Sequence, residues 1–101
     1  MIIYNVTVNV EAEIHDDWIN WMKTVHITDV MNTGCFIENK ICKVLSTQEG
    51  ETGHTYALQY TCKSMADLDE YQEKHAAELQ KDHVERYKGK FVAFRTLLEV
   101  V

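Results

Sequence analysis

His26 and Asp29 are the pair of residues in this sequence whose types and spacing best suit acid–base chemistry. On a continuous helix, residues three apart are neighbours, so Asp29 could orient the imidazole of His26 as a general base at the mouth of a pocket. The alternative is an ion pair near the end of a helix, because the negative end of the helix dipole favours a protonated histidine. Both interpretations stay open.

Two further histidines, His75 and His83, lie in a segment with helical spacing. At 100° per residue, His75 falls near the centre of the apolar stripe of this segment, and His83 falls on its flank. His75 is therefore the second candidate for a catalytic base. The alternative is that His75 is a hydrogen-bonded core histidine and that His83 lies at the surface.

Three large apolar side chains and one arginine are the candidate ligand-binding residues: Trp18, Trp21, Met22 and Arg95. The first three could line a pocket for a flat ligand, or they could pack as core against a sheet. Arg95 lies among apolar neighbours near the end of the chain. It could hold a carboxylate with two hydrogen bonds, or it could extend its head to water from an edge strand or an interface.

No set of metal ligands stands out in the sequence. The histidines, at positions 15, 26, 54, 75 and 83, form no pair at ligand spacing with a third acid in an obvious place. The spacings of Cys35, Cys42 and Cys62 do not match a zinc site, and neither a glycine-rich phosphate loop nor a serine nucleophile motif is present. We therefore predict no metal, no cofactor, and free thiols in a reducing compartment.

Four strands and two helices must position these residues. Residues 2–10 alternate between apolar and polar side chains, which predicts a strand whose inward face carries Tyr4, Val6 and Val8. The period then changes to that of an amphipathic helix over residues 13–34, with a glycine as its stop. The first candidate residues therefore lie on a helix that packs against the first strand.

A hairpin is predicted to follow this helix. The β-rich runs 35–47 and 54–62 are separated by the polar loop 48–53, which contains two glycines. Pairing about this loop would set two cysteines opposite residues other than each other, roughly Cys42 opposite Gln59 and Cys62 opposite Asn39. A disulfide between them is therefore not expected.

A second helix is predicted from Ser64, whose spacing to Asp67 resembles a capping box, to a stop at Gly89. Residues 91–101 form the predicted last strand. The order is β-α-β-β-α-β, and right-handed crossovers turn that order into an α+β fold, the ferredoxin-like plait. In that fold a four-stranded antiparallel sheet carries two helices on one face.

Length and composition narrow the class of protein. The chain has 101 residues, which predicts a single domain over residues 1–101. Its formal net charge of −6 makes nucleic acid an unlikely partner, because phosphate backbones repel an acidic chain. No apolar run approaches the ~20 residues of a membrane helix, and the first residues do not resemble a signal peptide. We expect a cytoplasmic protein that contacts no membrane.

Five strings carry a resemblance to a known family: MIIYNVTVNV at 1–10, WINWMK at 18–23, HITDV at 26–30, TGCF at 33–36 and FVAFRTLLEVV at 91–101. Together they resemble a bacterial family, domain-of-unknown-function family 4286, over essentially the whole chain. The resemblance implies the dimeric α/β-barrel group, in which two plaits pack sheet to sheet, and it implies no established reaction. It also implies a proline where this chain has Thr28, so the direction of Asp29 depends on whether the helix kinks there.

A second resemblance is to haem-degrading monooxygenases of the same superfamily. It implies an asparagine on the first strand, an aromatic residue on the second helix and an iron-ligating histidine further along that helix. Asn5, Tyr71 and His83 follow this order. Tyr71 stands where a tryptophan is implied, however, and the helix needs a gap to align His83, so we expect no haem binding.

The open face of the predicted sheet is the candidate interface. Two helices cover only one face, and apolar residues remain on both sides of each strand. Because a large exposed apolar patch usually marks an interaction surface, we expect a homodimer through the open face, with Leu97 in the interface.

Three functions stay open for this chain, and the sequence does not decide whether it is an enzyme. The first is a homodimeric small-ligand-binding module with a cavity between the first helix and the sheet, which takes a small organic molecule. The second is a cofactor-independent oxygenase or isomerase that uses His26 or His75 in the same cavity. The third is a structural or interaction module with a filled core. A cavity above roughly 300 Å³ near Trp21 would favour the first two.

Overall fold

The computed structural model describes residues 1–46 and 48–101. Its strands and helices follow the predicted order, although each predicted helix consists of shorter segments. In chain order the elements are β1 (Ile2–Val10), the 3₁₀ turn η1 (Ala12–Ile14), α1 (His15–Trp21), the π-helical segment η2 (Met22–His26), α2 (Ile27–Asn32), β2 (Glu38–Lys43), β3 (His54–Cys62), α3 (Met65–Lys74), α4 (Ala76–Arg86) and β4 (Phe91–Glu99).

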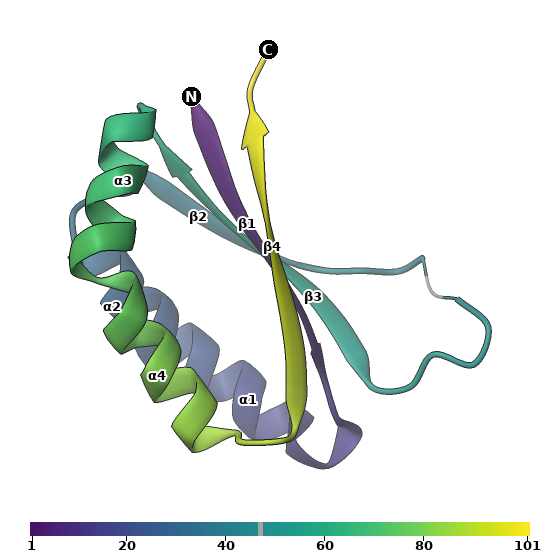
Figure 1. The fold of residues 1–101 in the computed structure, drawn as a ribbon. Coiled ribbons are helices and arrows are strands. Elements are labelled where there is room, and N and C mark those ends of the chain that lie inside the picture. Colours follow the sequence, from purple (N-terminus) through teal and green to yellow (C-terminus); the bar gives the residue numbers. More distant parts are fainter. Residues whose placement is uncertain (47) are drawn as a thin grey trace.

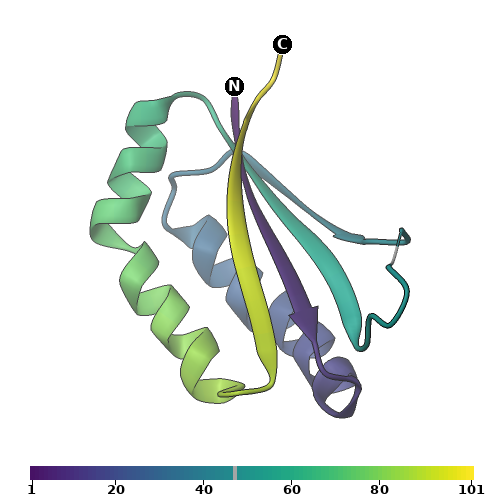
Figure 2. The ribbon, with the colours of Figure 1, turned by 45° about the vertical axis from the view of Figure 1, so that its right-hand side comes forward.

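The four strands form one antiparallel sheet in the order β2-β3-β1-β4. The helices lie together on one face of this sheet, and the opposite face carries no helix (Figures 1 and 2). The predicted α+β fold, a ferredoxin-like plait, is therefore confirmed. Two strands are shorter than predicted, since β2 spans Glu38–Lys43 and β4 ends at Glu99. Thr47, which the prediction placed in the second strand, lies outside the described residues.

Alternation along β1 decides which side chains face the helices. Tyr4, Val8 and Val10 are buried under the helices, and Val6 is half-buried on the same face. In an antiparallel sheet, directly opposite residues share a face. The helix-covered face therefore continues on β3 and β4 through the partners of these residues, among them Leu58, Tyr60 and Arg95.

The first helical region, from η1 to α2, runs without a break at Thr28. Within it, η2 has the wider turn of a π-helix, in which the amide of Ile27 donates to the carbonyl of Met22 five residues earlier. Helical backbone then continues through α2, and Gly34 with φ of 77° closes the region as predicted. Thr28 keeps the backbone N–H that a proline would lack, so Asp29 stays on a helix and is exposed.

The second helical region breaks at His75, which was predicted to lie inside one helix. His75 has φ of −128° and ψ of −34°, and it separates α3 from α4. Ser64 caps the start of α3, where its hydroxyl accepts from the amide of Asp67, as the capping pattern predicted. The break shifts the phase of the apolar stripe, so His83 is the buried histidine and His75 is only half-buried. The predicted positions of these two histidines are therefore reversed.

The register of the β2–β3 hairpin differs from the prediction by two residues. Cys42 pairs with Ala57 instead of Gln59, and Glu38 pairs with Thr61, so Cys62 does not lie opposite Asn39. A shift of two residues keeps every side chain on its predicted face, because the side-chain period of a strand is two. The three cysteines are free, as predicted.

The open face carries apolar side chains on β4, but Leu97 is not among them. Leu97 pairs with Tyr4 and therefore lies on the helix-covered side of the sheet, at its edge. Val92, Phe94 and Leu98 pair with the open face of β1 and are exposed. The predicted place of Leu97 in an interface is therefore wrong, and its neighbours on either side occupy that face. Among the described helices, none is long and apolar enough to span a membrane.

Candidate active site

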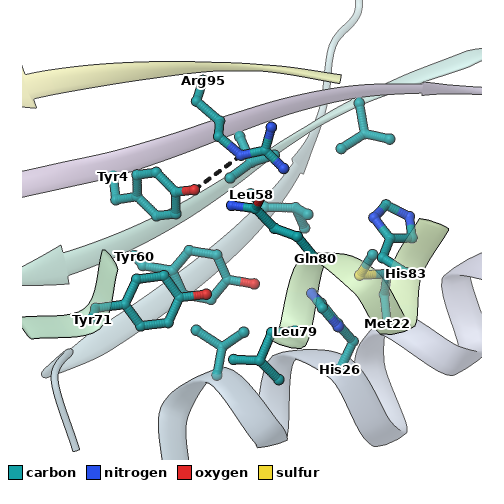
Figure 3. Close-up of a pocket in the computed structure, with 13 residues that line it drawn as sticks. Tyr4, Met22, His26, Leu58, Tyr60, Tyr71, Leu79, Gln80, His83 and Arg95 are labelled. Carbon is teal, nitrogen blue, oxygen red and sulfur yellow. Dashed lines mark hydrogen bonds between the residues drawn. The ribbon is translucent and has the colours of Figure 1, made fainter. Parts of the chain in front are cut away.

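A small cavity lies between η2, α4 and the helix-covered face of the sheet (Figure 3). Its volume is about 30 Å³, which exceeds the space that one water molecule needs. We call it the tyrosine–histidine cavity. Its lining comes from strands and helices far apart in the sequence: Tyr4, Val6, Val8, Met22, His26, Val30, Leu58, Tyr60, Tyr71, Leu79, Gln80, His83 and Arg95.

Strand alternation and the π-helical turn bring these residues together. Tyr4 and Tyr60 are cross-strand partners on β1 and β3, so their rings leave the sheet side by side. The ring of Tyr71, from α3, lies 5.8 Å from that of Tyr4. On the opposite wall, η2 supplies Met22 and His26. A π-helical turn changes the side-chain phase of a helix and is frequent at functional sites, and here both of its ends contribute to one cavity.

The tyrosine hydroxyls give the cavity its polar wall. The Nε–H of Arg95 donates to the hydroxyl of Tyr4 at 3.0 Å (Figure 3). The hydroxyl of Tyr60 has no hydrogen-bond partner among the described residues, although the side chain is only 3% exposed. Burial, followed by the proximity of the other tyrosines, raises the pKa of Tyr60 and of Tyr71. Both therefore keep their protons at neutral pH and can donate hydrogen bonds.

His83 is held in one neutral form by Trp18. The indole N–H of Trp18 lies 3.0 Å from Nε2 of His83, and both side chains are buried. An indole nitrogen only donates, so Nε2 must accept and the ring proton must be on Nδ1. Burial, followed by repulsion from His26 and Arg95, lowers the pKa of His83 to about 3. With its acceptor occupied, His83 can offer the cavity only a donor.

His26 is the better-placed base of the two histidines. Its ring stacks on Trp21 with 4.9 Å between the centroids and lies 5.6 Å from the ring of His83. Burial lowers the pKa of His26, while the carboxylates of Asp29 and Asp82 partly oppose this shift. Within the described part of the chain, no hydrogen bond engages the imidazole of His26. A neutral imidazole with a free acceptor nitrogen is therefore exposed to the cavity.

The structure brings some of the predicted site residues together and separates others. Met22, His26 and Arg95 line the tyrosine–histidine cavity. Trp18 and Trp21 are buried beside it and do not line it. Trp21 instead forms part of a shallow open depression of about 420 Å³ with Asp29, Asp82 and Arg86, among others.

His75 lies outside the tyrosine–histidine cavity. It lines an open acidic depression of about 330 Å³ with Asp29, Glu78 and Asp82. The predicted interaction of Asp29 with His26 exists only as an electrostatic attraction, because α2 directs Asp29 outward. The pair is therefore not a hydrogen-bonded acid–base dyad in this structure.

Tyr60 and Gln80 are cavity residues that sequence reasoning missed. Tyr60 has the same strand phase as Tyr56 and Leu58, and a tyrosine on a buried face must place its hydroxyl somewhere, which was the available signal. Gln80 gave no such signal, since its position depends on the helix break at His75. Asn5, from the haem-type pattern, lies on the open face with partners Gln59 and Thr96, away from Tyr71 and His83.

Across the part of the chain that the structure describes, no three His, Cys, Asp or Glu side chains are placed to hold a metal ion. Cys62 is buried, and burial followed by the charge of Asp67 raises the pKa of its thiol. A raised pKa disfavours the thiolate that metal binding and nucleophilic attack require. Cys62 is therefore a poor candidate for either role.

Comparisons with known proteins agree with this architecture. The model of the family described as "Domain of unknown function (DUF4286)" matches residues 1–101. None of the curated proteins matches the chain by sequence.

Solved structures share the fold at low sequence identity. HapK from Hahella chejuensis is similar with a TM-score of 0.71 and 12% identity, over 100% of this chain and 93% of that one. An ethyl tert-butyl ether D (EthD) family protein from Bacillus halodurans has a TM-score of 0.67 and 10% identity, over 100% of both chains. A dimeric ferredoxin-like protein of unknown function from Jannaschia has a TM-score of 0.61 and 15% identity, over 99% of this chain and 100% of that one. At these identities the similarity establishes the fold and not an activity.

Proposed function

Because the chain belongs to the DUF4286 family, whose description names no activity, we propose a function from its own geometry: a homodimer that binds a small organic molecule in the tyrosine–histidine cavity. The hydroxyl of Tyr60 is the observation that carries this proposal. A buried hydroxyl without a partner costs about 1–3 kcal/mol, and phenylalanine would fill the same space without that cost. A filled structural core gives no reason for the hydroxyl, whereas a ligand atom in the cavity would satisfy it.

The size of the cavity limits what can enter it. A volume of about 30 Å³ does not meet the expectation of a cavity above roughly 300 Å³, which would have favoured a ligand site over a filled core, and it is far below the size of a typical site for a drug-sized molecule. The proposal therefore rests on the hydroxyl of Tyr60 and not on the size of the cavity. The ligand is therefore compact, or only its polar head enters while the rest stays outside. Arg95 is exposed on the edge strand β4 and lines the cavity, so it marks the wall from which a ligand can approach.

Binding can be tested by NMR on isotope-labelled protein with a fragment set of small carboxylic acids, amides, phenols and ketones. We expect shifts at the amides of Met22, His26, Gln80 and His83. The control is Tyr60→Phe, which removes the buried, unpaired hydroxyl of Tyr60 and keeps the ring. If no fragment moves these signals, or if all the shifts fall on the open face of the sheet, the ligand-binding proposal is rejected.

The dimer is the second half of the proposal, and the open sheet face supports it. Phe94 is 63% exposed there, with Val92 and Leu98 on either side. Asn5, on the same face, is buried while its side-chain carbonyl has no partner within the described chain. A second copy packed on this face would cover the apolar side chains and could donate to Asn5. The structurally similar Jannaschia protein is described as dimeric.

Light scattering after size exclusion at micromolar concentration tests the dimer. We expect twice the chain mass of 11.8 kDa. An interface of about 800 Å² per partner is standard for a stable complex, so the mass should persist on dilution within the micromolar range. A mass of one chain would reject this half of the proposal without affecting the cavity.

Isomerisation is the second candidate function, favoured by the free imidazole of His26. This base could take a proton from carbon next to the carbonyl of a bound ligand and return it to a neighbouring atom, while a tyrosine hydroxyl donates to the developing enolate oxygen. The oxygenase version requires molecular oxygen as a second substrate. Deuterium uptake from D₂O into small ketones, followed by NMR, would be lost in His26→Gln but not in Gln59→Ala, a change on the open face. Equal uptake in all three proteins would reject it.

A further inference from the structure

We propose that the tyrosine–histidine cavity is an anion site, which takes the carboxylate of a compact organic acid through Arg95 and the hydroxyls of Tyr60 and Tyr71. This inference rests on the proposed ligand site and adds the chemical class of the ligand. It is carried by four observations on the charge and hydrogen-bonding character of the walls.

The cavity excludes the acidic side chains that dominate the chain. The sequence has 16 Asp and Glu residues against 10 Lys and Arg. No Asp or Glu is among the described residues that line the cavity, and Arg95 is the one lining side chain with a permanent charge. A cationic cavity in an acidic protein provides local attraction for an anion that the rest of the surface repels.

Arg95 lacks the carboxylate partner that the other arginine of the chain has. Arg86 forms an ion pair with Asp17 at 3.5 Å on the protein surface. Among the residues described, no carboxylate lies within ion-pair distance of Arg95, whose Nε–H is bound to Tyr4. Its terminal nitrogens remain for a ligand. An arginine fork matches a carboxylate with two parallel hydrogen bonds, which makes a carboxylate the natural complement.

The neutral polar groups of the cavity present donors. Figure 3 shows the hydroxyls of Tyr60 and Tyr71 directed toward the side where Gln80 and His26 lie. Tyr71 is near enough to Tyr60 to contribute to the raised pKa of Tyr60. Tyr60 has a free donor, because its hydroxyl is buried and unpaired. His83 adds no competing acceptor, since its Nε2 already accepts from Trp18. A buried anion needs several donors at once, and this wall supplies them.

The acidic residues nearest the cavity do not oppose this assignment. Asp29 and Asp82 act on His26 from outside the cavity, and both are exposed. Interactions of exposed charges are screened by salt over about 8–10 Å, whereas a charge inside the cavity is much less screened. Asp29 and Asp82 also favour the protonated form of His26. Protonation of His26 on entry of an anion would add a second cation to the site.

The test is an NMR titration with two matched pairs of probes, acetate against acetamide and benzoate against benzamide. Each amide keeps the shape of its acid and removes the charge. We expect acetate and benzoate to shift the backbone N–H signals of Met22, His26, Gln80 and His83. Both acids should bind about tenfold or more tightly than acetamide and benzamide. Arg95→Gln should remove this preference, and Tyr60→Phe should reduce acid binding several-fold. Arg86→Gln is the matched control and should change neither.

The outcomes separate this inference from the proposed function. If acetamide and benzamide bind as tightly as acetate and benzoate at the same residues, the cavity stands as a ligand site and the anion assignment is overturned. If neither acids nor amides nor other fragments move the cavity signals, both proposals fall. Acid binding that survives Arg95→Gln, or that shifts only surface lysines, would also overturn the anion assignment.

Discussion

Each face of the sheet buries one polar atom that has no hydrogen-bond partner in the described chain. On the helix-covered face it is the hydroxyl of Tyr60, and on the open face it is the side-chain carbonyl of Asn5. The first lies in a cavity enclosed by η2, α4 and two neighbouring tyrosines. The second lies on a surface that extends to exposed apolar residues of β4, such as Phe94.

The two faces show that a buried polar atom without a hydrogen-bond partner can call for different kinds of partner, depending on its surroundings. An unpaired buried polar group is costly on either face, because it has lost its water and gained nothing. Around Tyr60 the walls are fixed by the chain itself and the free volume is about 30 Å³, so whatever supplies the missing partner must be small. Around Asn5 one wall is absent, so only another large surface can complete the burial. The helix-covered face therefore suits a ligand, and the open face suits a second copy.

The largest expected effect is loss of the dimer in Phe94→Asp. A charge within the proposed apolar interface would be buried without a partner, and burying an unpaired charge costs several kcal/mol. Light scattering at micromolar concentration should give the mass of one chain, 11.8 kDa, with the helical circular dichroism retained.

Leu97→Asp is the matched control for this prediction. Leu97 is on the same strand and 52% exposed, but it lies on the opposite face of the sheet. This variant should stay dimeric. If both variants dissociate, or if Leu97→Asp alone does, the interface is not on the open face and the contrast between the faces fails.

A smaller effect, a loss of about 3 kcal/mol in the free energy of unfolding, is expected for Trp18→Phe. The change removes volume from a fully buried site and leaves Nε2 of His83 without its donor. Chemical denaturation measures the loss. The double variant Trp18→Phe with His83→Phe should lose less than the sum of the single changes, because the orphaned acceptor is gone. Strict additivity would show that the hydrogen bond contributes nothing.

Stability should also fall on acidification, through His83. Burial lowers its pKa from 6.5 to about 3 in the folded chain. Below pH 6.5 the histidine is therefore protonated in the unfolded chain and stays neutral in the folded chain. The stabilisation is fully present above pH 6.5 and is lost as pH falls toward 3, by up to about 1.4 kcal/mol per pH unit. Between pH 6.5 and 5 this amounts to about 2 kcal/mol.

His83→Gln isolates this effect from the other titrating groups. The glutamine side chain can still accept from Trp18 but cannot be protonated, so its unfolding free energy should fall less steeply over the same pH range. Denaturation midpoints of the two proteins between pH 7 and 4 give the comparison. Parallel curves would mean that His83 is protonated as easily in the folded chain as in the unfolded one.

The sequence could predict the two faces but not the cavity between them and the helices. Strand alternation placed Tyr4, Val6 and Val8 under the helices correctly. Its period of two tolerates errors, since the hairpin register was wrong by two residues and no side chain changed face. Leu97 was assigned to the wrong face because both phases of the last strand are apolar, and only pairing with β1 distinguishes them.

The helical side of the site depends on backbone events that residue types do not encode clearly. The break at His75 lies among good helix formers, so a regular 100° spacing carried across it reversed the positions of His75 and His83. The π-helical turn at Met22–His26 contains no proline or glycine from which it could have been predicted. Tyr60 and Tyr71 line one cavity because α3 packs against the sheet, and no local sequence pattern contains that packing.

The smallest expected effect compares two tyrosines of β3, on the same strand and the same face. The hydroxyl of Tyr56 lies 2.6 Å from Nε2 of His15, whereas that of Tyr60 has no partner in the described chain. Tyr56→Phe should therefore cost about 1 kcal/mol, the usual net value of a hydrogen bond. Tyr60→Phe should be neutral or stabilise by up to about 1 kcal/mol in the absence of ligand, because it removes only an unsatisfied group. Chemical denaturation at pH 7 resolves the difference. A clear loss in Tyr60→Phe would mean that its hydroxyl is already satisfied in the free protein, and the asymmetry that assigns a ligand to this face would disappear.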